Sequence, residues 1–340
     1  MTEKVKKTVL VTGAAGGVGR TICRILADRN FQVKGLVRPE DDVNSTEISR
    51  ENLVVGYVED PQAVYAAMQG VDAVVNCAAL LPNALHLGEE AFNRVNVLGA
   101  LNVLRQASKH KIKNVIFFST ISVVDHITRK ITQAEIRDYV ENPHDAYLAS
   151  KINLEKELEK ESPAYDGQID IIRPAFIYGP GNFSVWQDAL KLIKNGKMVL
   201  IGDGNVPLPL IYAEDIARFI LVLIDRPIDH SGIGIYVLAS QESTTMKNVF
   251  HFIADYFGVK HSCHVPYWPL FVAATIVGFF PEKMKFGRLK LLTKARVLQY
   301  SKGYDLTNLI NPPPLGFVAE TKYKEGLVKM LDEYKKLWKL

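Results

Sequence analysis

The sequence predicts an α/β protein with a doubly wound parallel sheet and a smaller C-terminal lobe. Three observations lead to this fold class. Short apolar runs recur through the first half of the chain and alternate with segments of helical periodicity. A glycine-rich turn joins the first apolar run to the first helical segment. Later runs end in small or hydroxyl-bearing residues, and a parallel sheet binds its ligands at such carboxyl ends.

The first strand, turn and helix predict a dinucleotide-binding Rossmann unit. Residues 8–11 form an apolar run, and residues 18–26 have helical spacing. Gly13 permits a tight turn, Gly16 lets the backbone approach a pyrophosphate, and Gly19 lets the helix pack closely on the strand. Three glycines often form only a turn, but the flanking strand and helix favour phosphate binding. The predicted contacts are Gly13, Ala15, Gly16, Gly17, Val18 and Gly19.

The next strands are predicted at residues 32–37, 53–57, 73–79 and 114–118, and the first three of these supply further cofactor contacts. Arg38 follows the second strand, and an arginine without a neighbouring carboxylate suits the 2′-phosphate of NADP(H). A solvated surface arginine is the alternative, which leaves NAD(H) open. Tyr57 stands where its ring could stack on adenine. The small residues Cys77, Ala78 and Ala79 leave room for the ribose and diphosphate.

The composition excludes several classes of function. The chain has 340 residues with 41 basic and 37 acidic side chains. Its net charge of +4 is too small to indicate binding to nucleic acid. Cys23, Cys77 and Cys263 have neither metal-ligand nor paired spacing, which predicts a reducing, cytoplasmic location and no metal site. Lysines lead directly into the first strand, so we expect no signal peptide.

Hydroxyl groups and a tyrosine–lysine pair form the candidate catalytic centre. Ser119 and Thr120 directly follow the fifth predicted strand, with Ser122 two residues on. Tyr147 and Lys151 are four residues apart in a helical segment, which places both on one face. An ammonium lowers the pKa of a nearby phenol from about 10, so Tyr147 could transfer a proton near neutral pH. Tyr-x-x-x-Lys alone usually marks a surface helix, but here several independent features agree on one site.

These motifs resemble the extended (atypical) branch of the short-chain dehydrogenase/reductase superfamily, the NAD-dependent epimerase/dehydratase family. The likeness includes the Gly-x-x-Gly-x-x-Gly spacing after Thr12, the helical segment that starts at Asn96, and the motif of residues 173–182. It extends from the first strand to about residue 240.

The resemblance implies roles for individual residues. Thr120 would hold the substrate oxygen, with Ser119 and Ser122 as neighbouring hydroxyls, and Tyr147 would transfer the proton during hydride exchange. Lys151 would also bind the nicotinamide ribose. The resemblance adds five cofactor contacts to those predicted above: Asn96, which would brace the site, and Tyr147, Lys151, Pro174 and Ile177.

The substrate side of the resemblance favours a lipophilic alcohol or ketone. Sugar-nucleotide enzymes of this branch place an arginine after Gly-Asp-Gly, where this chain has Leu208. The pattern is closest to 3β-hydroxysteroid dehydrogenases and dihydroflavonol reductases. A sugar-nucleotide epimerase or dehydratase is the alternative, and a non-enzymatic dinucleotide sensor is a third. The predicted substrate contacts are Leu81, Thr120, Phe176, Trp186 and Tyr212, with Trp268 a further candidate, although each aromatic ring could instead pack in the core.

The expected domains are a dinucleotide-binding domain, residues 1–180 with a returning segment at about 208–240, and a substrate-binding lobe, residues 181–207 and 241–340. Within the lobe, residues 266–280 are apolar and residues 283–296 are rich in lysine and arginine. The apolar run is too short to span a bilayer, so it lies either at a membrane interface or over the substrate pocket. A second copy of the chain is the other expected partner, because homodimers formed through Rossmann-domain helices are common in the family.

Overall fold

The computed structural model describes the chain except residues 1–5, 125–130, 182, 229–230, 279–293 and 339–340. Its centre is a parallel sheet with the strand order β10-β6-β5-β4-β1-β2-β3. The strands are β1 (Thr8–Thr12), β2 (Gln32–Val37), β3 (Leu53–Val55), β4 (Ala73–Asn76), β5 (Asn114–Phe118), β6 (Gln168–Pro174) and β10 (Gly232–Leu238). This is the predicted α/β Rossmann sheet.

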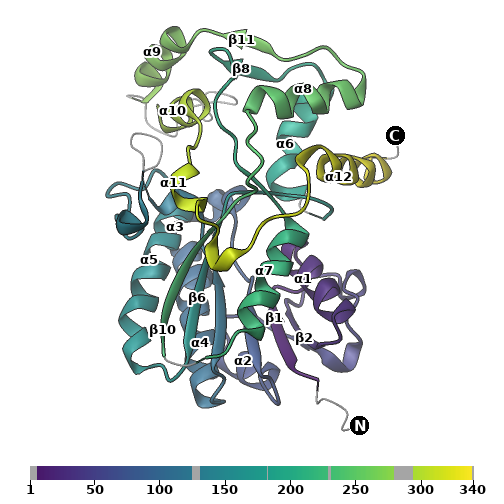
Figure 1. The fold of residues 1–340 in the computed structure, drawn as a ribbon, viewed down its shortest axis with the longest axis vertical. Helices are drawn as coiled ribbons and strands as arrows, with labels where there is room; N and C mark the ends of the chain where they lie inside the picture. Colours follow the sequence, from purple (N-terminus) through teal and green to yellow (C-terminus); the bar gives the residue numbers. More distant parts are fainter. Residues whose placement is uncertain (1–5, 125–130, 182, 229–230, 279–293, 339–340) are drawn as a thin grey trace.

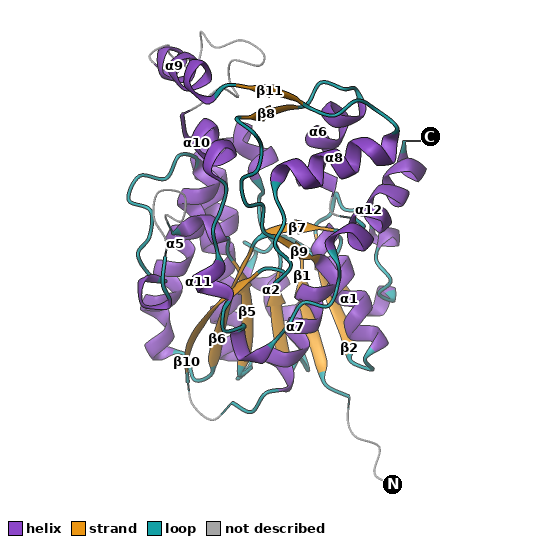
Figure 2. Cartoon of the chain, turned by 45° about the horizontal axis from the view of Figure 1, so that its top comes forward, coloured by secondary structure: helices purple, strands orange, loops and turns teal. Residues whose placement is uncertain are grey.

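Helices cover both faces of the sheet (Figure 2), which explains why its central strands are apolar throughout. All residues of β1 and β6 are buried. The helices α1 (Gly17–Asp28) and α7 (Ala213–Asp225) pack on one face. The other face carries α2 (Pro61–Ala67), α4 (Ala100–Lys109) and much of α5 (Ala146–Glu161), with α3 (Gly88–Phe92) beside α5. Figure 1 shows the carboxyl ends of the strands directed toward the smaller lobe.

Two local predictions differ from the structure. The strand expected at residues 53–57 ends at Val55, because Gly56 and Tyr57 turn the chain toward α2. The helix expected from Asn96 begins as a π-helical segment, Asn93–Gly99, before α4 continues it. π-Helical turns occur often at functional sites, and this one carries Asn96.

The lobe has its own hydrophobic core. Its elements are β7 (Phe176–Tyr178), α6 (Phe183–Lys194), β8 (Val199–Ile201), β9 (Leu210–Tyr212), α8 (Met246–Phe257), β11 (Cys263–Val265), α9 (Tyr267–Gly278), α10 (Lys294–Lys302) and α12 (Tyr323–Leu337). Side chains of α6, α8 and α12 pack together on β7 and β9. The strand pairs β7–β9 and β8–β11 are both parallel.

Part of the C-terminal segment returns to the dinucleotide-binding domain. Tyr304, Leu306 and Leu309 are buried in the core that contains α1 and α7, and Leu309 lies in the short helix α11 (Thr307–Ile310). The sequence assigned residues 241–340 to the lobe as a whole. The structure divides this region, because the apolar side chains of residues 304–309 are buried against the sheet domain.

Candidate active site

The glycine turn has the geometry of a phosphate-binding turn. Gly13 has φ +64°, and its N–H donates to the carbonyl of Leu36 at 2.9 Å. A Cβ on Gly19 would lie 2.2 Å from the carbonyl oxygen of Gly13, so a side chain cannot be accommodated there. At the start of α1, Gly16 offers no side-chain cap, and the described first turn contains no acidic residue. The helix dipole and backbone N–H groups are therefore placed to receive a dinucleotide diphosphate.

The predicted adenosine contacts have carboxylate neighbours. Arg38 pairs with Asp41 at 2.7 Å and with Glu40 at 3.2 Å. Hydrogen bonding to Asp41 raises the pKa of Arg38. Tyr57 is exposed, and its hydroxyl donates to Glu40 at 3.2 Å. The expectation that no carboxylate lies beside Arg38 is wrong, because the turn after β2 brings both acidic side chains back onto the guanidinium.

The end of β4 is braced by buried amides. Thr12 donates to Asn76 at 2.6 Å and accepts from the N–H of Ala78 at 3.2 Å, which holds the segment Cys77–Ala79 beside the glycine turn. Asn96 accepts from the N–H of Leu80 at 2.7 Å and donates to Ser150 of α5 at 2.9 Å. Asn96 thus ties the chain after β4 to the helix that carries Tyr147 and Lys151. The structure places it as a brace of the site.

The catalytic candidates meet at the carboxyl end of β5. Thr120 lies beside Tyr147, and hydrogen bonding from its side chain acts to lower the pKa of the tyrosine. The ammonium of Lys151 donates to the carbonyl of Phe118, the last residue of β5, at 2.8 Å. The same nitrogen lies 5.9 Å from the centre of the Tyr147 ring. The structure therefore brings Thr120, Tyr147 and Lys151 together, and α5 presents the tyrosine and lysine on the face directed at β5.

Burial controls the titration of this pair. It raises the pKa of Tyr147 to about 12 and lowers the pKa of Lys151 to about 8. The sequence predicted that Lys151 lowers the tyrosine pKa. In the structure desolvation is the larger effect, and the hydrogen bond to Thr120 lowers the pKa only in part.

A buried ion pair fixes the helix that carries the pair. Arg173 of β6 donates to Glu155 of α5 at 2.9 Å through Nε and at 2.5 Å through Nη2, and both side chains are fully buried. Arg173 also donates to the carbonyl of Ile136, and Tyr139 donates to Glu155. The arginine of the motif at residues 173–182 is therefore structural, since it fixes α5 against the sheet one helical turn beyond Lys151. Pro174 follows it as the buried last residue of β6.

The predicted substrate contacts divide into two groups. Leu81 is exposed, and Phe176 is partly buried. Trp186 and Tyr212 are buried in the lobe core, and the indole of Trp186 donates to the carbonyl of Ile177 at 2.8 Å. In this arrangement the second pair packs the core. Trp268, the further candidate, is an exposed residue of α9.

Tyr304 is a site residue that sequence reasoning missed. Its ring contacts that of Phe176 edge-on, with the ring centres 5.2 Å apart, and its hydroxyl has a hydrogen bond with Ser122. Ser122 thus has a partner from a segment more than a hundred residues away, while Thr120 faces Tyr147. No local motif surrounds Tyr304 in the sequence, so only the tertiary structure could identify it.

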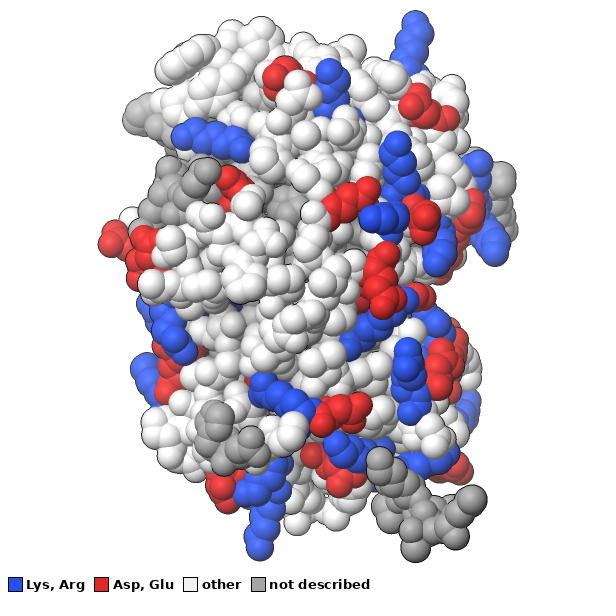
Figure 3. Space-filling model, in the orientation of Figure 1, with Lys and Arg blue, Asp and Glu red and all other residues white. Residues whose placement is uncertain are grey.

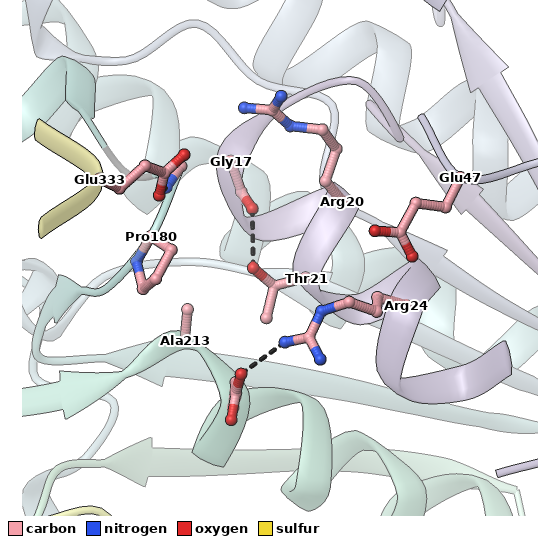
Figure 4. A pocket seen from close by; sticks show the side chains of 10 residues that line it. Gly17, Arg20, Thr21, Arg24, Glu47, Pro180, Ala213 and Glu333 are labelled. Atoms are coloured by element: carbon pink, nitrogen blue, oxygen red, sulfur yellow. Dashed lines mark hydrogen bonds and ion pairs between the residues drawn. The ribbon is translucent and has the colours of Figure 1, made fainter. Parts of the chain in front are cut away.

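A hollow of about 200 Å³ lies beside the glycine turn (Figure 4). It is lined by Gly17, Arg20, Thr21, Arg24, Glu47, Pro180, Gly181, Ala213, Glu214 and Glu333. Arg24 pairs with Glu214 at 2.5 Å, and Glu333 of α12 accepts from the N–H of Gly181 at 2.9 Å. Arg20, in the first turn of α1, is a second candidate that the sequence analysis missed. Its guanidinium adds positive charge next to the turn.

The geometry fits a bound dinucleotide. The glycine turn would hold the diphosphate, and Lys151 and Tyr147 lie where the nicotinamide end would meet the substrate. When bound, the cofactor supplies or accepts a hydride. The residues of this chain would then offer the Tyr147 hydroxyl as a proton donor or acceptor and the Thr120 hydroxyl to orient a substrate oxygen.

Comparison with known proteins identifies the class. The sequence model of the NAD dependent epimerase/dehydratase family matches residues 9–239. The protein is thus an NAD(P)-dependent enzyme of the extended short-chain dehydrogenase/reductase type. The chain belongs to the NAD dependent epimerase/dehydratase family.

The similar curated proteins include reductases, dehydrogenases and epimerases. A 2-alkyl-3-oxoalkanoate reductase of Stenotrophomonas maltophilia is 29% identical over 62% of this chain and 62% of its own length. An N-acetyl-alpha-D-glucosaminyl-diphospho-ditrans,octacis-undecaprenol 4-epimerase of Escherichia coli O157:H7 is 28% identical over 95% of this chain and 94% of its own. The human decarboxylating sterol-4-alpha-carboxylate 3-dehydrogenase is 24% identical over 82% of this chain and 69% of its own length.

Solved structures share the fold at low sequence identity. A UDP-glucose 4-epimerase of Thermotoga maritima covers 97% of this chain and 99% of its own at 20% identity, with a TM-score of 0.72. The enzyme WbmH of Bordetella bronchiseptica, solved in complex with NAD+, has the same coverage and identity and a TM-score of 0.69.

Proposed function

We propose that the protein interconverts a secondary alcohol and a ketone or aldehyde, with hydride exchanged with a nicotinamide cofactor and with Tyr147 as the proton donor and acceptor. The meeting of Thr120, Tyr147 and Lys151 at the carboxyl end of β5 carries this proposal, because it places an acid–base group beside a hydroxyl that can hold the same substrate oxygen. Lys151 is held nearby by the carbonyl of Phe118, with its ammonium 5.9 Å from the centre of the Tyr147 ring.

The test is turnover of a panel of ketones with NADPH and NADH, followed by Tyr147→Phe. This change removes only the hydroxyl, so we expect kcat to fall by about 10²–10⁴-fold with cofactor binding retained. Tyr65→Phe, at an exposed tyrosine of α2, is the matched control. If the Tyr147→Phe enzyme keeps its rate, the proton-transfer role is wrong.

A lipophilic substrate is the finer part of the proposal. The site is flanked by Phe176 and Tyr304, and Leu208, at the position where sugar-nucleotide enzymes carry an arginine, is buried in the lobe core. Relatives named for sterol and oxoalkanoate substrates support this class. For the cofactor we propose NADP(H), on the strength of Arg38 at the end of β2, although structures of similar fold were solved with NAD.

A sugar epimerase is the second candidate. The observation that favours it is the match to the undecaprenol-linked 4-epimerase over 95% of this chain, more than the reductase match covers. An epimerase returns its cofactor to the starting state in each turnover. Cofactor retained through purification, and turnover without added cofactor, would select this candidate; release and stoichiometric NADPH consumption select the reductase.

A further inference from the structure

The helix α9 exposes an apolar surface at the far end of the lobe. Trp268, Val272 and Ile276 are 70%, 51% and 55% exposed, and their spacing of four residues aligns them along one face. Among the described residues of α9, only Ala274 is buried. In Figure 3 the described residues at this end of the molecule are mostly uncharged, whereas charges of both signs lie over the sheet domain.

Aromatic residues cluster at the start of α9. Tyr267 and Phe271 stack with their ring centres 5.4 Å apart, and the rings of Tyr267 and Trp268 meet edge-on at 5.5 Å. Tyrosine and tryptophan favour the boundary between lipid and water because one end of each side chain is apolar and the other is polar. The exposed aromatic and apolar side chains of α9 could therefore insert at the boundary between the lipid headgroups and the acyl chains.

The charge of the neighbouring chain favours an anionic surface. Residues 266–280 contain no charged side chain. The next sixteen residues contain the single acidic residue Glu282 and the basic residues Lys283, Lys285, Arg288, Lys290, Lys294 and Arg296, of which those before 294 lie outside the described residues. These cations follow α9 directly in the sequence. They would attract anionic headgroups, whereas two copies of the chain meeting through this face would bring like charges together.

We propose that α9 docks on the surface of an anionic phospholipid bilayer and lies in the interface plane. Its 12 residues rise about 18 Å, well short of the roughly 30 Å of a hydrocarbon core. Consistently, no helix in the described part of the chain is long and apolar enough to cross a membrane. Docking is a binding property of the lobe and does not depend on the proposed reaction.

The docked helix is linked to the catalytic site through the chain. It packs on α10, where Val297 is buried. Two residues beyond α10, the N–H of Tyr304 donates to the carbonyl of Pro207 at 3.1 Å, and its side chain reaches Ser122 and Phe176. If the proposed function holds, docking would bring the lobe that carries Phe176 close to a lipophilic substrate dissolved in the bilayer.

The experiment is co-sedimentation of the full chain with vesicles of phosphatidylcholine mixed with phosphatidylglycerol, and with phosphatidylcholine alone. We expect binding to the anionic vesicles that weakens with added salt. Val272→Glu should lower the partition coefficient at least about tenfold, because it places a charge in the apolar face. Val318→Glu is the matched control, since Val318 is 53% exposed and lies next to residues packed on the sheet domain.

Tryptophan fluorescence gives a second readout. Trp186 is buried in the lobe core, whereas Trp268 is the most exposed of the large apolar side chains in the described residues. Anionic vesicles should shift the emission to shorter wavelength, and Trp268→Phe should remove that shift. Failure of the wild type to bind, or equal binding by Val272→Glu, would overturn the proposal. Self-association that Val272→Glu disperses, without vesicle binding, would assign the face to a second copy. Turnover of a water-soluble ketone by Val272→Glu tests the catalytic proposal separately.

Discussion

Single residues decide the chemistry of this site through their surroundings. Lys151 shows this best, because it has two environments at once: burial in the interior and a hydrogen bond to the end of β5. Desolvation outweighs the attraction of Glu155 and leaves the lysine with a lowered pKa. A lysine that titrates near physiological pH is suited to proton exchange, and the same burial makes it a cost to the folded state.

That cost predicts a pH-dependent stability. The pKa of Lys151 is about 8 in the folded protein, whereas a free lysine has a pKa of 10.5. Between these values the unfolded chain holds the extra proton, so wild-type stability rises with pH. Below about pH 8 the cost is present in full. We therefore expect the stability of Lys151→Met relative to wild type to fall by roughly 2–3 kcal/mol between pH 7 and pH 10.5.

Urea unfolding of both proteins at the two pH values measures this difference. Lys109→Met, at an exposed lysine in the last turn of α4, serves as the control and should show a constant difference. If the difference in unfolding free energy between Lys151→Met and wild type is also the same at both pH values, the lowered pKa of Lys151 is contradicted.

Arg38 decides the cofactor preference in our proposal. Its guanidinium is half-exposed just after β2 and forms ion pairs with Glu40 and Asp41. To contact a 2′-phosphate, it must break these ion pairs or keep them while it also binds the phosphate. We expect Arg38→Ala to weaken NADPH binding by about tenfold or more and NADH binding little, because a charge-assisted contact contributes roughly 1.5–3 kcal/mol. Fluorescence titration of wild type and variant with both cofactors checks this. Equal loss for the two cofactors, or tighter NADH binding by the wild type, would remove the argument for NADP(H).

At the scale of elements, α5 depends on its connection to β6. The helix carries Tyr147 and Lys151, and Glu155 on the same helix is held by Arg173. Removal of one member of a fully buried pair leaves a charge without compensation and typically costs about 3–5 kcal/mol. We expect Arg173→Met to destabilise the protein by this amount in urea unfolding.

The double variant Arg173→Met with Glu155→Met distinguishes the pair from simple packing. Because both charges are then absent, much of the lost stability should return. If the double variant is as unstable as the sum of the single changes, the two side chains do not act as a pair. Arg137→Met is a control, because Arg137 forms an exposed ion pair with Glu159 of the same helix.

At the scale of the whole molecule, the C-terminal helix α12 joins the lobe to the dinucleotide-binding turn. Its buried face packs in the lobe core, and Glu333 reaches the backbone of Gly181 beside α1. Leu327 is fully buried and Leu337 is exposed on the same helix. We expect Leu327→Ala to cost about 2–5 kcal/mol and Leu337→Ala less than about 0.5 kcal/mol in urea unfolding. Similar effects of the two changes would show that α12 contributes little to the lobe.

The sequence alone determined the sheet domain and the identity of its principal motifs. Buried parallel strands are apolar on both faces, and a glycine turn between such a strand and a helix is typical of phosphate binding, so β1, β2, β5 and the phosphate-binding turn are local patterns. The spacing of Tyr147 and Lys151 is local as well, because one helical turn connects them.

Only the tertiary structure decided which groups surround these motifs. Burial raised the pKa of Tyr147 where spacing alone predicted a decrease, and Trp186 and Tyr212 are packed in the lobe core. The contact of Tyr304 with Ser122 joins segments far apart in the chain. Desolvation and long-range packing depend on what the rest of the chain places around a residue. A pattern of neighbouring residues does not contain that information, whereas the period of a strand or helix is set by the residues themselves.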